Sequence, residues 1–106
     1  MERALLVTIK LETERDNWSM EDTALELEEL AAACGADILD NITCVRERPS
    51  PKFFIGSGKA EEISLLCQEL NADTVVFSHD LSGTQQRNLE EVIQRKTIDR
   101  TQLILD

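Results

Sequence analysis

The sequence predicts an α/β protein, with a mostly parallel sheet of four to five strands and helices on both faces. Short apolar runs alternate along the chain with longer segments whose apolar residues recur at helical spacing. Each helical segment follows a strand, an order that favours βαβ units and therefore parallel strands. With 106 residues, the chain is long enough for one domain with its own core, and we expect residues 1–106 to form it.

The first strand and helix have clear boundaries. Residues 4–9 form a nearly continuous apolar run, which predicts a strand buried on both faces. Ser19 has the position of a helix N-cap, with Asp22 placed to complete a capping box. Gly35 is expected to end this helix in the left-handed conformation. The helical stripe consists of Met20, Ala24, Leu27, Ala31 and Cys34.

The middle of the chain contains a strand, a loop and a glycine turn. Residues 36–45 alternate in polarity, which predicts a longer and less buried strand at a sheet edge. Pro49 and Pro51 mark residues 46–52 as an irregular loop. Residues 53–55 are apolar and predict a short strand that leads into the glycine turn.

The last part of the chain repeats the strand–helix order. A helix is expected after Gly58, with an apolar face formed by Ile63, Leu66, Cys67 and Leu70. Residues 73–78 predict another buried strand. Ser82 and Gln85 form a second capping-box pattern, and residues 96–98 predict a final short strand. The remaining tail is apolar and has no turn signal, so we expect the natural polypeptide to continue.

Composition restricts the function classes. No apolar run is long enough for a membrane span and no secretory signal is visible, so we expect a cytoplasmic protein. The three cysteines and single histidine lack metal-ligand spacing, so no metal site is expected. A net charge of −10 argues against broad nucleic-acid binding. However, Glu47 alone opposes a local cluster of bases formed by Arg46, Arg48, Lys52 and Lys59. These bases either contact RNA or are only surface side chains of a loop.

The glycine turn has a phosphate-binding layout without being a P-loop. Helix-start N–H groups point outward after a glycine-rich turn, which suits an anion. The P-loop pattern requires a glycine and a hydroxyl residue where this chain has Phe53 and Ala60. A lysine in the first helical turn is unfavourable with the helix dipole unless an anion offsets it. The candidate anion site is Gly56, Ser57, Gly58 and Lys59, where both glycines can adopt positive φ. The alternative is a tight turn with a solvated lysine.

Three segments in fixed order, residues 55–62, 81–90 and 99–106, together resemble the N-terminal domain of the HflX-type GTPases. The resemblance covers essentially the whole chain. Gly83 is a departure, because the family usually has proline at this first helical position. The resemblance implies that the full protein continues into two long helices and a P-loop domain that binds GTP and Mg²⁺. It implies no cofactor and no GTP hydrolysis for this domain alone.

The resemblance also implies partners, namely the large ribosomal subunit with its RNA and the protein's own GTPase domain. Arg87 and Asn88 are expected either to contact RNA or to tie their helix to the turn at residues 99–100, and an ion pair is an alternative for Arg87. Asp99 is placed to cap a following helix. The RNA- or anion-binding candidates are Arg46, Arg48, Lys52, Gly56, Ser57, Gly58, Lys59 and Arg87. The interdomain-junction candidates are Asn88, Asp99, Arg100 and Thr101.

Two rival functions use the same glycine turn. One is a nucleotide-binding domain that binds ATP, with weak ATPase or RNA-unwinding activity centred on residues 56–59. The other is a small-molecule sensor. A hydrolase based on His79 and Asp80 is disfavoured, because no nucleophile with a defined partner accompanies them, and no catalytic residue is assigned.

Overall fold

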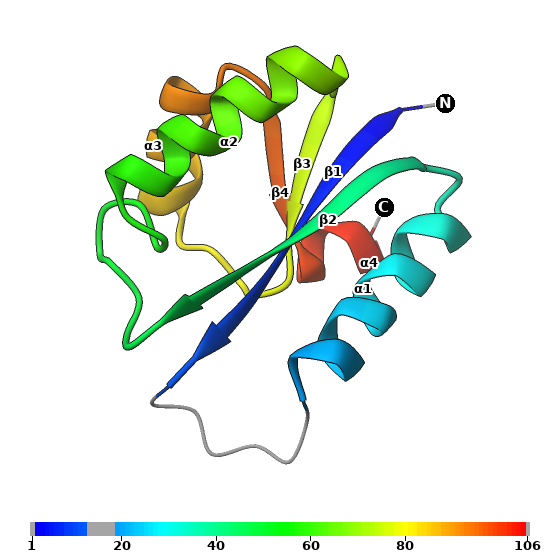
Figure 1. Ribbon diagram of the computed structural model, residues 1–106, viewed down its shortest axis with the longest axis horizontal. Helices are drawn as coiled ribbons and strands as arrows, with labels where there is room; N and C mark the ends of the chain where they lie inside the picture. The colour runs from blue at the N-terminus through cyan, green and yellow to red at the C-terminus, as the bar shows by residue number, and fades with distance from the viewer. Residues whose placement is uncertain (1, 13–18, 106) are drawn as a thin grey trace.

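A computed structural model of the chain describes residues 2–12 and 19–105 and shows strands and helices in alternation (Figure 1). The strands are β1 (Arg3–Leu11), β2 (Asp37–Arg46), β3 (Thr74–Phe77) and β4 (Lys96–Asp99). The helices are α1 (Met20–Ala33), α2 (Ser57–Leu70), α3 (Gly83–Ile93) and α4 (Arg100–Leu105). The predicted α/β class is therefore confirmed.

The described strands form one four-stranded parallel sheet in the order β2-β1-β3-β4. β1 lies inside the sheet, and its residues Ala4 to Ile9 are buried, as the apolar run predicted. β2 is an edge strand and is only partly buried, which confirms its expected place. Successive side chains of a strand point to opposite faces, so an inner strand buries residues on both.

Helices cover both faces of the sheet, and each face has its own apolar cluster (Figure 1). Leu5, Val7 and Ile9 of β1 belong to the larger cluster, which includes residues from α2 and α3. Ala4 and Leu6 point the other way, into a smaller cluster with residues from α1 and α4. Burial of these side chains is the main source of stability.

The predicted helix caps are present. Ser19 and Asp22 form a capping box at the start of α1, and Ser82 and Gln85 form another at the start of α3. Gly35 follows α1 with φ of 82°, the left-handed conformation that was expected. Two residues of the predicted apolar stripe of α1, Leu27 and Ala31, are buried. Cys34, assigned to the same stripe, is exposed at the C-cap.

Two local predictions are wrong. Residues 53–55 form no strand of the sheet, because Phe54 has φ of 65° and pairs back with Ser50 in an isolated antiparallel bridge. A chain that reverses direction there cannot run alongside the parallel strands. Gly58 does not adopt positive φ: it lies inside α2, and only Gly56 of the pair is left-handed, with φ of 87°.

The described helices include none long and apolar enough to cross a membrane. Cys34, Cys44 and Cys67 are free thiols, and the last two are buried.

Candidate nucleic-acid interface

The carboxyl ends of the parallel strands meet at one edge of the sheet, where α/β proteins place ligand sites. β2 ends there at Arg46, and α2 begins nearby at Ser57. The connection between them, residues 47–56, contains two of the predicted basic residues, Arg48 and Lys52. This loop and the two helix starts beside it form the candidate site.

The loop is held by a compact turn. Ser50 N donates to Phe54 O at 2.8 Å, and Phe54 N donates to Ser50 O at 2.9 Å. Phe54 and Ile55 are 5% and 1% exposed and belong to the larger apolar cluster. Burial of these two side chains anchors a loop that would otherwise have to be solvated.

Side chains of α3 tether the same loop. Gln85 Nε2 donates to Ser50 O at 2.8 Å, and Asn88 Nδ2 donates to Lys52 O at 3.0 Å. Of the two alternatives for Asn88, the tie to the turn at residues 99–100 is not the contact observed, because its amide donates to the loop at residues 47–56 instead. The tether brings Lys52 close to α3, whose exposed face carries Arg87.

The guanidinium of Arg46 contacts the glycine turn. Its Nη1 donates to Ile55 O at 2.7 Å and lies 2.8 Å from the position that a Cβ on Gly56 would take. The close approach that this glycine permits is thus occupied by the protein's own guanidinium. Within the described part of the chain, Arg46 Nε is buried without a hydrogen-bond partner. Arg46 consequently has a structural role at the turn, and its guanidinium occupies the space beside Gly56.

Lys59 lies in the first turn of α2 and forms an ion pair with Glu62, with Nζ 3.4 Å from Oε1. The carboxylate of Glu62 thus places a negative charge beside Lys59. This charge offsets the unfavourable interaction of the lysine with the helix dipole. Burial raises the pKa of the Cys44 thiol, and the positive charges of Lys59 and Arg46 oppose this rise. Two cations therefore converge on the start of α2, with one carboxylate beside them.

Arg48, Lys52 and Arg87 are exposed, and within the described residues none of them forms an ion pair. Lys52 Nζ lies 5.3 Å from the centre of the Phe53 ring, a cation–π distance that leaves the ammonium at the surface. The ion-pair alternative for Arg87 is not observed. We call the five bases at this site, Arg46, Arg48, Lys52, Lys59 and Arg87, the basic edge.

The junction candidates surround the start of α4. Asp99 is 5% exposed; its Oδ2 accepts from Leu81 N and its Oδ1 from Gln102 N, both at 2.9 Å. Gln102 Oε1 accepts from Asp99 N in return, so Asp99 caps α4 as expected. Arg100 pairs with Glu26 of α1, and Thr101 donates to Asp80.

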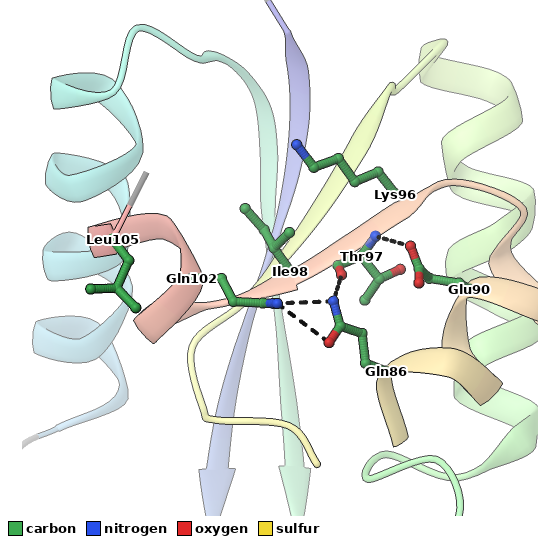
Figure 2. A pocket seen from close by; sticks show the side chains of 7 residues that line it. All are labelled: Gln86, Glu90, Lys96, Thr97, Ile98, Gln102 and Leu105. Atoms are coloured by element: carbon green, nitrogen blue, oxygen red, sulfur yellow. Dashed lines mark hydrogen bonds between the residues drawn. The ribbon is translucent and has the colours of Figure 1, made fainter. Parts of the chain in front are cut away.

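A polar network beside β4 escaped the sequence analysis (Figure 2). Gln86 Nε2 donates to Thr97 O at 2.8 Å, and Thr97 N donates to Glu90 Oε2 at 3.2 Å. Gln102 of α4 accepts a hydrogen bond from Gln86 Nε2 through its Oε1 atom. Both side chains line a cavity of about 350 Å³ beside β4. The spacing of Asp99 and Gln102 is a capping-box signal that would have located one end of this network.

His79 is also explained by local contacts. Ser78 Oγ lies 2.9 Å from His79 Nδ1 and accepts from Ile9 N at 2.8 Å. Ser78 is 7% exposed, and its hydroxyl joins β1 to the end of β3. A serine held in this way serves the sheet and is poorly placed to attack a substrate.

Comparison with known proteins places the whole chain in one family. A family model described as "GTP-binding GTPase N-terminal" matches residues 21–106. A protein named GTPase HflX from Escherichia coli is 44% identical over 99% of this chain and 24% of its own length. Its namesakes in Caldanaerobacter subterraneus and Flavobacterium psychrophilum are 39% and 36% identical, again over 99% of this chain. They are covered over 23% and 25% of their own lengths, so the chain spans about a quarter of these curated relatives. The chain therefore belongs to the HflX GTPase family and corresponds to its N-terminal domain.

Proposed function

We propose that this domain engages the large ribosomal subunit by placing its basic edge against ribosomal RNA. The observation that supports this proposal is the grouping of Arg48, Lys52 and Arg87, which are exposed and have no acidic partner within the described residues. Arg48 and Lys52 lie in the loop that Gln85 and Asn88 of α3 hold, Arg87 lies on the exposed face of the same helix, and the protein's net charge is −10. Each base placed against a phosphate releases counterions and so favours binding.

The charges elsewhere favour one orientation of the domain on RNA. α1 carries acids in its first turn, and Glu26 is already paired with Arg100. RNA phosphates would repel this side of the molecule and attract the basic edge. Arg46 and Lys59 raise the positive potential at the start of α2, although both have partners inside the protein.

The same proposal assigns a regulatory role to the start of α4. Asp99 connects the backbone of Leu81, just before α3, to the first turn of α4. A shift of α3 caused by RNA contact would therefore move α4 and whatever follows it. We propose that a P-loop domain outside these residues binds GTP and Mg²⁺ in the cytoplasm. The N-terminal domain described here should hydrolyse no GTP by itself.

Ribosome-stimulated GTP hydrolysis tests this coupling in a longer protein that contains the domain. Arg48→Ala combined with Arg87→Ala should reduce the stimulation by large subunits and leave basal hydrolysis unchanged. The matched control combines Arg3→Ala with Lys96→Ala, because these two exposed bases begin their strands and lie at the opposite edge of the sheet. Undiminished stimulation in the first variant would contradict the proposed coupling.

A further inference from the structure

Two amide side chains of α3 hold the loop at residues 47–56. Gln85 Nε2 donates to Ser50 O at 2.8 Å, and Asn88 Nδ2 donates to Lys52 O at 3.0 Å. The two partners lie 35 residues apart in the first bond and 36 residues apart in the second. Both bonds therefore connect the helix to a distant segment of the chain.

The composition of the loop makes such outside donors important. Pro49 and Pro51 lack an N–H group, so neither can donate a backbone hydrogen bond. The bridge between Ser50 and Phe54 closes the loop, and the buried side chain of Phe54 anchors its far end. On the near side, α3 supplies donors to the carbonyl groups of Ser50 and Lys52.

Gln85 uses both halves of its amide group. Its Oε1 accepts from Ser82 N at 2.9 Å, which completes the capping box, and its Nε2 binds the loop. A glutamate would also complete the capping box, because that motif requires only an acceptor. Asn88 lies in the middle of α3, where asparagine is a poorer helix former than alanine. Neither residue is explained by the needs of the helix alone.

We propose that Gln85 and Asn88 are positioning residues, which hold the loop in its binding conformation before it meets RNA. This inference rests on the proposed function of the basic edge. Arg48 and Lys52 each lie two residues from Ser50, so the two bonds fix the backbone that carries both bases. A loop that is already ordered loses less conformational entropy on binding, and it therefore binds more tightly through the same contacts.

Loss of a positioning residue differs measurably from loss of a contacting base. Removal of a base that contacts a phosphate lowers both the affinity and the slope of log K against log salt, because fewer counterions are released. In a longer protein containing this domain, Asn88→Ala should weaken binding to large ribosomal subunits about fivefold. The slope should stay unchanged, because the bases still reach their phosphates once the loop is bound. Thr84→Ala is the matched control, because Thr84 is exposed on the same helix and is not one of the two residues that hold the loop.

Gln85→Glu tests the second bond without disturbing the start of α3. The substitution keeps an acceptor for Ser82 N and removes the donor to Ser50 O. It also adds a negative charge, which repels RNA by itself. Thr84→Glu adds the same charge at the neighbouring exposed position, so Gln85→Glu should weaken binding more than Thr84→Glu does.

Limited proteolysis of the free protein separates positioning from a direct contact of Asn88 with RNA. Trypsin cleaves after lysine, and Asn88 holds the carbonyl group of the peptide bond between Lys52 and Phe53. Without this hydrogen bond the loop should open more often. Asn88→Ala should therefore raise the initial rate of cleavage after Lys52 at least about twofold, whereas Thr84→Ala should not.

Each contrary result would overturn the inference in a different way. Weaker binding with unchanged cleavage in Asn88→Ala would show that Asn88 contacts RNA itself. Faster cleavage with unchanged binding would show that the loop needs no positioning, and a reduced salt slope would show that phosphate contacts were lost. The proposed function fails separately, if Arg48→Ala combined with Arg87→Ala leaves binding unchanged.

Discussion

Arg46 and Gly56 illustrate what determines the site at the residue scale. The sequence indicated that Gly56 would adopt a special backbone conformation, and φ of 87° confirms it. Nothing in the sequence indicated that Arg46 would support this turn, because its bond to Ile55 O depends on a loop of eight intervening residues folding back onto the end of β2. Arg46 therefore supports the turn, and its contact with RNA stays a prediction. Arg48, Lys52 and Arg87 remain available at the surface.

The two glycines of the turn should respond oppositely to alanine. Gly56→Ala should destabilise the protein by about 1–3 kcal/mol, because its φ is positive and its Cβ would meet Arg46 Nη1 at 2.8 Å. Gly58→Ala should stabilise it by about 0.5 kcal/mol, because Gly58 is helical and has open space around it. Urea denaturation followed by circular dichroism measures both free energies of unfolding. A loss at Gly58 as large as that at Gly56 would contradict this structure of the turn.

The three thiols should differ in reactivity. At pH 8, a disulfide reagent should modify Cys34 quickly, and Cys44 and Cys67 slowly, because the last two are buried. Burial also raises the pKa of both inner thiols above the ordinary value of 9.0. Because folding favours the protonated form of both thiols, the free energy of unfolding should fall as pH rises above about 9.

A fast phase of thiol modification that survives in Cys34→Ser would show that the assignment of Cys34 as the reactive thiol is wrong.

At the element scale, local signals were reliable where local contacts decide the structure. Both capping boxes involve residues three apart, and both were predicted from the sequence. The strand predicted at residues 53–55 was wrong because an apolar run indicates burial, and burial alone does not distinguish a strand from an anchored loop. Phe54 and Ile55 are buried as a strand would require, but the bridge from Phe54 to Ser50 reverses the chain. Asn88 could not be assigned because its partner, Lys52 O, lies 36 residues earlier.

The start of α3 should accept proline. Gly83 is the first helical residue, where the φ of proline fits and its missing N–H costs little. Ser82 precedes it with φ of −69° and ψ of 161°, a conformation that proline permits in the residue before it. Gly83→Pro should therefore raise the free energy of unfolding by about 0.4–1 kcal/mol through the unfolded state.

The matched control for Gly83→Pro is Gly58→Pro. Gly58 is the second residue of α2, so the residue before it is already helical and clashes with the proline ring. This substitution should lower the melting temperature, whereas Gly83→Pro should raise it. Thermal unfolding by circular dichroism compares the two, and destabilisation by both would show that the start of α3 is described wrongly.

At the scale of the whole molecule, the alternation of strands and helices predicted the α/β class and the two covered faces. The strand order was not predictable, because β3 pairs with β1 across a long connection whose register depends on packing. The position of the basic edge followed partly from the sequence, since parallel strands bring their carboxyl ends together. The packing of α3 against the loop was not predictable, because it depends on the hydrogen bonds of Gln85 and Asn88 to residues far earlier in the chain.

The central claim is that the basic edge contacts ribosomal RNA. Co-sedimentation of a longer protein containing this domain with purified large subunits, over a salt series, tests it most directly. Arg48→Ala combined with Arg87→Ala should weaken binding and reduce the slope of log K against log salt by about 1.5, as expected for two lost phosphate contacts. Arg3→Ala combined with Lys96→Ala should leave both quantities unchanged. Unchanged binding and slope in the first variant would contradict the claim and assign the RNA contact to another surface.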